Sequence, residues 1–334
     1  MCKTLAGIFL VIINQLGATA VFSNDIKPVF FRGNLRDARF DVDRGLMLFV
    51  DRNNTDVIQS YDLRSGKIEV VARFEDFHYI TFSALYKSGL IFSANDNNDY
   101  EEIGGTRIYQ SRIGYLNLDT QEYKVLNKWW QDVNWVGLGV LMGYYYDENI
   151  QTGFLGTIDL RHNNKVRKLE KDFSAVCITC FLAGNRCFYY HGTSETGETT
   201  NLVEIDLQSG KSKRYDQIGG FSEARPISKN NHILLVTSEK HPDFLYNINT
   251  NKRVPLSFSS AGNVFQVAIK GDCLFAAVPG DHNDTVLYRV DIQTGKTLKK
   301  TTFSGYVCSM EWFDNKLYLV MMFGGEHLGL YVLQ

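Results

Sequence analysis

The sequence is poor in proline and carries no excess of charge of either sign. Only 5 of its 334 residues are proline and 13 % are aromatic, a composition that argues against a disordered chain. The formal net charge of −2 gives no electrostatic reason to expect nucleic acid or a membrane surface as a partner. No apolar run after residue 23 is long enough to cross a bilayer, so we expect no membrane span in the mature protein.

The one long apolar run lies near the start, at residues 5–13. It falls short of the ~20 residues that span a bilayer, and a small-x-small triplet follows it at residues 18–20. These are the features of a cleaved secretory signal. We therefore predict a signal peptide at residues 1–23 and a single domain at residues 24–334, in a protein secreted to the periplasm or the extracellular space. A membrane anchor or a hydrophobic first strand is the alternative.

Cysteine is too scarce for a disulfide framework. Cys2 would leave with the signal, and the five cysteines that remain allow at most two bridges. Cys177 and Cys180 have the spacing of a redox or metal motif, but they lie in a hydrophobic strand pattern and no second pair completes a zinc site. We expect buried, unbridged cysteines, with a link between Cys180 and Cys187 across one hairpin as the alternative.

The sequence also lacks the local motifs of catalysis. It has no nucleophile elbow, no HExxH zinc motif, no P-loop and no dinucleotide fingerprint. Its basic residues have no interleaved aromatics, which disfavours nucleic-acid binding. Asn53 and Asn283 each begin a triplet that accepts an N-glycan if the host is eukaryotic. The motifs therefore do not decide whether the protein is an enzyme.

A short phrase recurs along the whole chain, as in YDLRSGK at residues 61–67 and VDIQTGK at residues 290–296. The copies follow one another at steps of 41 to 55 residues, with Val332 in the seventh slot. Repeats of about 40–45 residues with four short strands each are typical of propeller blades. The polar residue at the second position of each copy is Asp62, Asn117, Asp159, Asp206, Asn247 or Asp291.

The two ends of the chain complete the count of strands. The sequence ends after a third strand, at residues 330–333, and an unassigned strand at residues 26–32 precedes the first unit. We therefore predict an all-β fold, a seven-bladed β-propeller of four-stranded antiparallel blades, closed by the N-terminal strand completing the last blade. The longest step between phrases is attributed to a loop insertion near residues 95–107.

The repeated phrase, a hydrophobic residue followed by Asp/Asn-Leu/Ile-x-Thr/Ser-Gly-Lys, resembles that of YVTN-type and related quinoprotein-like propellers. The resemblance covers essentially the whole mature chain and implies blade architecture. It implies no particular activity, and no catalytic residue is carried over from it. The YWTD signature of lipoprotein-receptor propellers and the Gly-His and Trp-Asp marks of WD40 repeats are not in the sequence.

The connections between second and third strands are acidic, and the turns between third and fourth strands are basic. In a propeller these two sets lie on opposite faces, so we expect one acidic and one basic face. Oxygen-rich loops on one face could hold Ca²⁺, and a metal-dependent lactonase or hydrolase is therefore one hypothesis. The candidate metal ligands are Asp51, Asp96, Asp147, Asp281 and Glu326, with His282 or His327 as a catalytic base.

Aromatic residues lie near the strand entries on the predicted acidic face. Phe77, Trp129, Trp130 and Trp135 could line the channel mouth and hold a hydrophobic or flat ligand. Packing between neighbouring blades is the alternative. Our leading hypothesis is a secreted binding module that holds a protein or a small ligand, which could be cationic, on this face. The calcium-dependent enzyme and a structural or assembly module are the other two.

Overall fold

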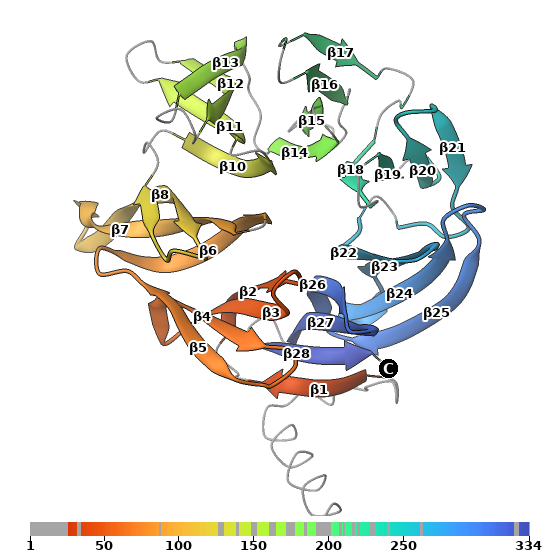
Figure 1. Cartoon of the computed structure of the whole chain (residues 1–334), viewed down its shortest axis with the longest axis horizontal. Coiled ribbons are helices and arrows are strands. Elements are labelled where there is room, and N and C mark those ends of the chain that lie inside the picture. Colours follow the sequence, from red (N-terminus) through yellow and green to blue (C-terminus); the bar gives the residue numbers. More distant parts are fainter. Residues whose placement is uncertain are drawn as a thin grey trace, which may run out of the picture. The chain divides into compact units, whose positions relative to one another are not determined.

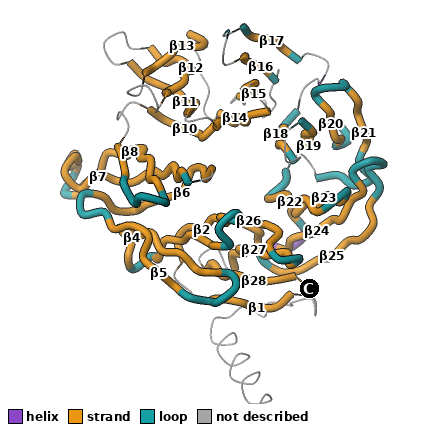
Figure 2. The backbone as a smooth tube through the Cα atoms, in the orientation of Figure 1, coloured by secondary structure: helices purple, strands orange, loops and turns teal. Residues whose placement is uncertain are grey.

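Every described strand lies in a four-stranded antiparallel sheet (Figure 1). The computed structural model describes residues 26–31, 35–86, 88–125, 130–137, 140–147, 152–159, 165–171, 178–183, 186–191, 202–206, 209, 211–215, 218, 221–227, 232–238, 241–260, 263–323 and 327–333. These residues form seven sheets, one for each expected blade. The predicted all-β fold of seven four-stranded antiparallel blades is confirmed. Strands dominate the coloured part of the backbone in Figure 2.

The chain divides into two compact units, which we describe separately. The larger unit, residues 36–263, carries five of the sheets. Its first two sheets are built from β2 (Leu35–Asp41), β3 (Leu46–Asp51), β4 (Asn54–Asp62), β5 (Ile68–Arg73), β6 (Phe77–Tyr86), β7 (Gly89–Ile103), β8 (Thr106–Asn117) and β9 (Tyr123–Val125). The next three are built from β10 (Trp130–Gly137), β11 (Val140–Asp147), β12 (Thr152–Asp159), β13 (Lys165–Lys171), β14 (Ile178–Ala183), β15 (Arg186–His191), β16 (Val203–Asp206), β17 (Ser212–Arg214), β18 (Glu223–Pro226), β19 (Ile233–Thr237), β20 (Phe244–Asn247) and β21 (Lys252–Pro255).

The smaller unit joins residues 1–35 with residues 264–334 and carries the other two sheets. They are built from β22 (Gln266–Lys270), β23 (Cys273–Pro279), the short helix η2 (Asp281–Asn283), β24 (Asp284–Asp291) and β25 (Thr297–Ser304), then β26 (Tyr306–Phe313), β27 (Lys316–Phe323), β28 (His327–Leu333) and β1 (Ile26–Phe31). Ile26 lies opposite Leu333, so β1 is the fourth strand of the sheet that β26 begins. Closure of the whole propeller by this strand stays a prediction.

The repeated phrase has a local physical cause in the structure. Each of its six polar residues is the last residue of the third strand of its sheet. The side-chain oxygen of Asp62 accepts the backbone N–H of Ser65 at 2.6 Å, and that of Asp291 accepts the N–H of Thr294 at 2.8 Å. Such bonds favour the charged carboxylate, so they lower the pKa of Asp62, and the Thr294 hydroxyl and N–H lower that of Asp291. The phrase therefore encodes the turn into the fourth strand.

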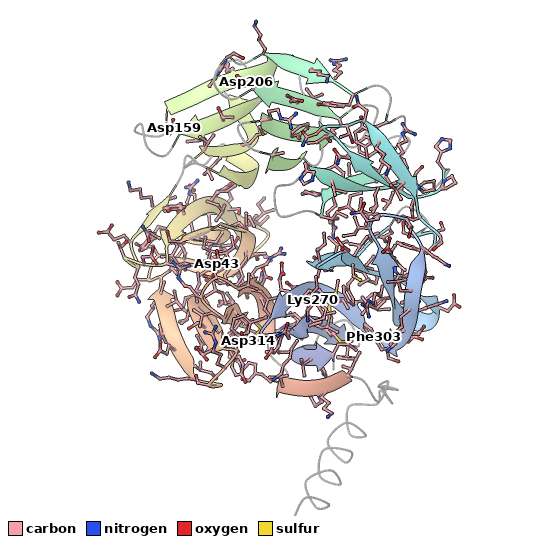
Figure 3. The ribbon with its side chains drawn as sticks, turned by 45° about the vertical axis from the view of Figure 1, so that its right-hand side comes forward. Asp43, Asp159, Asp206, Lys270, Phe303 and Asp314 are labelled. Carbon is pink, nitrogen blue, oxygen red and sulfur yellow. The ribbon has the colours of Figure 1, made fainter. Side chains whose placement is uncertain are left out.

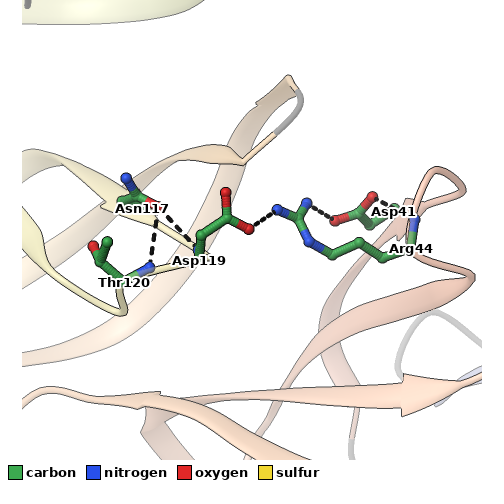
Figure 4. A network of polar contacts seen from close by, with 5 residues as sticks. All are labelled: Asp41, Arg44, Asn117, Asp119 and Thr120. Atoms are coloured by element: carbon green, nitrogen blue, oxygen red, sulfur yellow. Dashed lines mark hydrogen bonds and ion pairs between the residues drawn. The ribbon is translucent and has the colours of Figure 1, made fainter.

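The first two blades are also linked at their turns (Figure 4). Arg44, in the turn between β2 and β3, pairs through Nη1 with Asp41 Oδ2 at 2.7 Å and through Nη2 with Asp119. The backbone N–H of Asp119 donates in turn to Asn117 Oδ1 at 2.9 Å. The Arg44 hydrogen bond lowers the pKa of Asp119. The Arg44 guanidinium thus links Asp41 of the first blade to Asp119 in a turn of the second blade.

The cores lie between neighbouring sheets. Leu48 and Ile58 of the first blade pack with Phe82 and Phe92 of the second in one buried cluster. Burying side chains of this size contributes roughly 1.5–3 kcal/mol each, so the contact between the two blades stabilises both of them. In the described part of the chain, no helical segment has the length and apolar character that a bilayer crossing needs.

Cys187 is free and buried, so the alternative link to Cys180 is not formed. The strand register explains this, because Cys187 lies opposite Leu182 whereas Cys180 lies opposite Tyr189. The Cys187 thiol is 3.4 Å from the sulfur of Met142, and burial raises its pKa to about 12.

We expect the Cys187 thiol to resist alkylation in the native protein, because the thiolate is the reactive form and burial suppresses it. A brief iodoacetamide pulse at pH 8, followed by peptide mapping by mass spectrometry, measures this. The half-buried Cys273 and Cys308 should carry label first. Labelling of Cys187 at the rate of Cys308 would contradict the expectation, and full labelling in urea is the control.

Candidate functional site

The hairpin of the second blade extends beyond its sheet. Strand β7 has 15 residues and β8 has 12, whereas the neighbouring β6 pairs with β7 only as far as Asp96, opposite Phe77. The pairing between β7 and β8 continues to Ile103, opposite Thr106. The insertion expected near residues 95–107 is therefore present, but it extends the two strands and does not form a loop. We call residues 97–110, the two-stranded extension, the ribbon.

Two glycines make the ribbon possible. Gly104 and Gly105 have φ angles of +59° and +79°, in the left-handed region that other residues avoid. Positive φ at both central residues is what a two-residue hairpin turn requires. The Gly-Gly pair at the tip thus turns what looks like a polar loop into continuous strand pairing.

A bulge fixes the base of the ribbon. Asn95 lies opposite Ser111 and Tyr100 opposite Tyr109, so the four residues 96–99 face a single residue of β8. Arg112 holds the bulge, since its Nε donates to Asp96 Oδ2 at 3.1 Å and its Nη2 pairs with Asp99. This charge-assisted pairing orients the ribbon relative to its sheet.

The bulge is also tied to the segment that precedes β6. The side chain of Asn98 donates to Asp76 Oδ1 at 3.1 Å, and that of Asn97 donates to the Glu75 carbonyl at 3.2 Å. The backbone N–H of Asn97 donates to the Asp76 carbonyl at 2.8 Å. The ribbon therefore leaves the sheet in a defined direction.

Four aromatic rings run from the ribbon to β6. The ring centroids are 5.6 Å apart for Tyr100 and Tyr109, 4.5 Å for Tyr109 and His78, and 4.7 Å for His78 and Tyr79. We call these four residues the aromatic row. Tyr79 has a φ angle of +55° and lies where the β6–β7 register shifts, so a bulge turns its ring outward and leaves it 47 % exposed. The Nδ1 atom of His78 is buried without a hydrogen-bond partner.

Both ends of the aromatic row carry an arginine. The Arg36 guanidinium lies 4.7 Å from the Tyr79 ring centre, and that of Arg107 lies 4.7 Å from the Tyr100 ring centre. Exposed apolar side chains lie beside the tip, since Ile103 is 58 % and Ile108 48 % exposed. Exposed aromatic and branched apolar groups on one projecting element are unusual for a surface that only meets water.

The ribbon and its base are acidic. Between residues 75 and 112 the described carboxylates outnumber the two arginines, Arg107 and Arg112. The six carboxylates are those of Glu75, Asp76, Asp96, Asp99, Glu101 and Glu102. Because an excess of carboxylates attracts cations, this surface is suited to a ligand of positive charge.

Of the four candidate ligand-binding aromatics, the structure describes the side chain of Phe77 only. Phe77 is only 6 % exposed and packs in the core cluster of the first two blades, with its ring 6.4 Å from Tyr123. Its neighbours in sequence, not its own ring, reach the surface. Trp130 and Trp135 lie on β10, but their side chains are outside the described residues, as is the whole of Trp129.

Two of the candidate metal ligands already have partners within the chain. Asp51 is buried, and its Oδ1 accepts the N–H of Asn53 at 2.8 Å. Asp96 is paired with Arg112. Asp281 opens η2. No group of three His, Cys, Asp or Glu residues in the described ranges is placed to hold a metal ion.

For three of the other candidates the structure describes only the backbone, and the fourth lies outside the described residues. His282 lies in η2, His327 begins β28 and Asp147 ends β11, and none of these three side chains is among those described. Glu326 lies outside the described residues. A catalytic role for His282 or His327 stays a prediction.

Sequence reasoning did not identify the aromatic row. A usable signal was present, because the step between the first two phrases is the longest and its extra residues place Tyr100 and Ile108 around a Gly-Gly pair. The exposure of Tyr79 had no such signal, since it depends on a bulge between β6 and β7.

No family model and no curated protein matches this sequence. Solved structures match in fold. The RRP9 WD40 repeats superpose with a TM-score of 0.57 at 10 % identity, covering 94 % of this chain and 98 % of that one. This chain is a seven-bladed β-propeller. A chain of the mitotic checkpoint complex gives a TM-score of 0.56 at 10 % identity, covering 94 % of both chains.

A third match is longer than this protein. The acylaminoacyl peptidase of Pyrococcus horikoshii superposes with a TM-score of 0.60 at 13 % identity. The match covers 92 % of this propeller and 51 % of the peptidase chain. Identities this low establish the shared fold and no shared activity.

Proposed function

We propose that this propeller is a binding module that holds a basic, extended segment of a partner protein along the ribbon of its second blade. The observation that carries the proposal is the ribbon itself, an acidic two-stranded extension with exposed Tyr100, Ile103 and Ile108. We further propose that the module acts after secretion. The expected signal at residues 1–23 lies outside the described residues.

The open edges of the ribbon support strand addition. On one side β6 pairs no further than Asp96, and on the other β9 pairs only with residues 114–116 of β8. Apart from the pairing of β7 with β8 itself, no described strand pairs with residues 97–103 or 106–111. An extended peptide can add to such an edge through backbone hydrogen bonds. The charges of Glu101 and Glu102 would limit edge-to-edge association of the propeller with itself.

The aromatic row supports a basic partner. Lysine and arginine bind over aromatic faces, and such contacts contribute about 0.5–2 kcal/mol each. Arg36 and Arg107 already occupy this geometry within the chain, so the rings of Tyr79 and Tyr100 can accept a guanidinium. The surrounding carboxylates would speed the encounter with a cationic segment and favour it over an acidic one.

The test compares labelled peptides by fluorescence anisotropy. The basic strand-forming peptide RVRYRVRY should bind more tightly than EVEYEVEY, which reverses the charge, and than RGRGRGRG, which keeps the charge without strand-forming side chains. In the key variant, Asn-Gly replaces residues 97–110. Asp96-Asn-Gly then forms a three-residue hairpin loop with glycine at the left-handed position, and Asp96 stays available to Arg112.

Removing the ribbon should weaken binding of RVRYRVRY by about tenfold or more, because the variant loses the strand edge and two aromatic contacts together. Tyr100→Ser should give a smaller loss. Val125→Ser is the matched control, since Val125 is equally exposed on β9 of the same blade. Unchanged affinity without the ribbon would overturn the proposal. Equal binding of all three peptides, or no binding of any, would do so as well.

A further inference from the structure

A hollow lies in the smaller unit, between the sheets that begin with β22 and β26. It has a volume of about 400 Å³, within the range of small-molecule sites. This hollow is independent of the ribbon and of the function proposed for it. It is lined by Phe275, Leu287, Arg289, Lys299, Thr301, Trp312, Asn315, Lys316 and Leu333.

Strand register explains why these residues share one space. Phe275 lies opposite Arg289, which in turn lies opposite Lys299, so the three form a row across β23, β24 and β25. Directly opposed residues project from the same face of a sheet. On the other sheet, Trp312 and Leu333 lie at the two ends of a row across β26, β27 and β28. The wall on β23–β25 thus carries Phe275 with Arg289 and Lys299, and the wall on β26–β28 carries Trp312 and Leu333 with Lys316.

The charge in the hollow is of one sign. Arg289, Lys299 and Lys316 line it, and no carboxylate is among the lining residues. Arg289 and Lys299 are direct cross-strand neighbours, and like charges in that position destabilise a sheet. Arg289 Nε points to the Cys273 sulfur at 3.4 Å, and its guanidinium lies 5.9 Å from the Phe275 ring centre. An anion in the hollow would meet the positive charges of Arg289 and Lys316.

Trp312 supplies both an apolar surface and a donor. Its ring meets Phe275 edge-on with centroids 5.0 Å apart, and Lys270 Nζ lies 4.3 Å from its centre. Lys270, labelled in Figure 3, also donates to the Asn315 carbonyl at 3.4 Å. The indole Nε1 of Trp312 is buried and has no hydrogen-bond partner. A buried donor without an acceptor costs about 1–3 kcal/mol, which an acidic oxygen of a ligand would relieve.

We propose that this hollow binds a small organic anion with a flat apolar body. The rings of Phe275 and Trp312 and the side chains of Leu287 and Leu333 hold the body. Arg289 and Lys316 hold the carboxylate or sulfonate, and Trp312 Nε1 donates the remaining hydrogen bond.

The experiment uses two fluorescent probes that differ in one group. 8-Anilino-1-naphthalenesulfonate carries the required anion on aromatic rings, and N-phenyl-1-naphthylamine has the same rings without the sulfonate. We expect one molecule of the sulfonate per folded chain, bound about tenfold more tightly than the neutral probe, since a hydrogen bond to a charged group contributes about 1.5–3 kcal/mol.

Variants separate this site from general surface binding. Arg289→Gln should weaken binding of the sulfonate probe by about tenfold and leave the affinity for the neutral probe unchanged. Lys316→Gln and Trp312→Phe should give smaller losses of affinity for the sulfonate probe. Trp312→Phe keeps an aromatic ring and removes only the hydrogen-bond donor. Lys252→Gln, an exposed lysine of β21, is the matched control. Urea midpoints of all variants establish that each is folded.

Equal affinity for the two probes would overturn the proposal, because it would leave only an apolar hollow. The same holds if Arg289→Gln changes the sulfonate affinity no more than Lys252→Gln does. Absence of any stoichiometric binding to the folded wild-type protein would overturn it too. Because no part of the ribbon is altered, these outcomes are independent of the peptide experiment.

Discussion

Replacing Asp243 by alanine should lower the free energy of unfolding by about 2–4 kcal/mol, among the largest effects of any single polar change in this propeller. The Asp243 side chain is fully buried. Its Oδ2 accepts the backbone N–H of Ser260 at 2.6 Å and its Oδ1 accepts that of Ser238 at 3.3 Å. Alanine removes the acceptor of two buried amides at once, and each donor left without an acceptor lowers the free energy of unfolding.

Urea titration followed by far-UV circular dichroism measures the loss. Asp243→Asn is the informative partner variant, because its amide keeps one acceptor oxygen and should cost about half as much. Asp272→Ala, an exposed aspartate in the turn after β22, is the control and should change little. An alanine variant with the wild-type midpoint would contradict the assignment of Asp243 as a buried link between these two segments.

Replacing Gly114 by valine should lower stability by about 3 kcal/mol or more, because the side chain has no space. Gly114 on β8 lies directly opposite Phe92 on β7. A Cβ at Gly114 would lie 2.2 Å from Cζ of the Phe92 ring. The ring is 1 % exposed and packs against Phe74 at a centroid distance of 5.0 Å, so it cannot move aside cheaply.

The same urea assay measures this change, and a second substitution gives the control. Gly114→Ala should lower the free energy of unfolding less than Gly114→Val does. Adding Phe92→Leu to Gly114→Ala should recover part of the loss, because it frees the space above residue 114. If the double variant is no more stable than Gly114→Ala, the clash with Phe92 is not the cause. Wild-type stability of Gly114→Val would exclude the packing described here.

The repeat predicted the blades well because its cause is local. An Asp or Asn at the end of a third strand hydrogen-bonds the next turn within three residues, so the turn is written in the sequence wherever the phrase occurs. At the same position in two other turns, Gln121 and Asn251 take positive φ angles in place of glycine, and the turn still forms. Such local hydrogen bonds can be predicted from the sequence even when the contacts with other blades are unknown.

The ribbon and the hollow were missed for the opposite reason. Residues 95–107 have the polar composition of a loop, and only pairing across a Gly-Gly turn makes them strands. The row of Phe275, Arg289 and Lys299 exists only once three strands are in register. Candidate ligands such as Asp51 and Asp96 were chosen for their acidity. Backbone and arginine partners that the sequence does not reveal engage both of them.

The pairing of β1 with β28 has a consequence for how the protein is made. Ile26 emerges from the ribosome some three hundred residues before its neighbour Leu333. Strand β1 therefore stays without its partner until β28 has been synthesised, and contacts between such distant residues are slow to form. The sheet of β1 and β26–β28 can thus be completed only after the strands of the other six described sheets have left the ribosome.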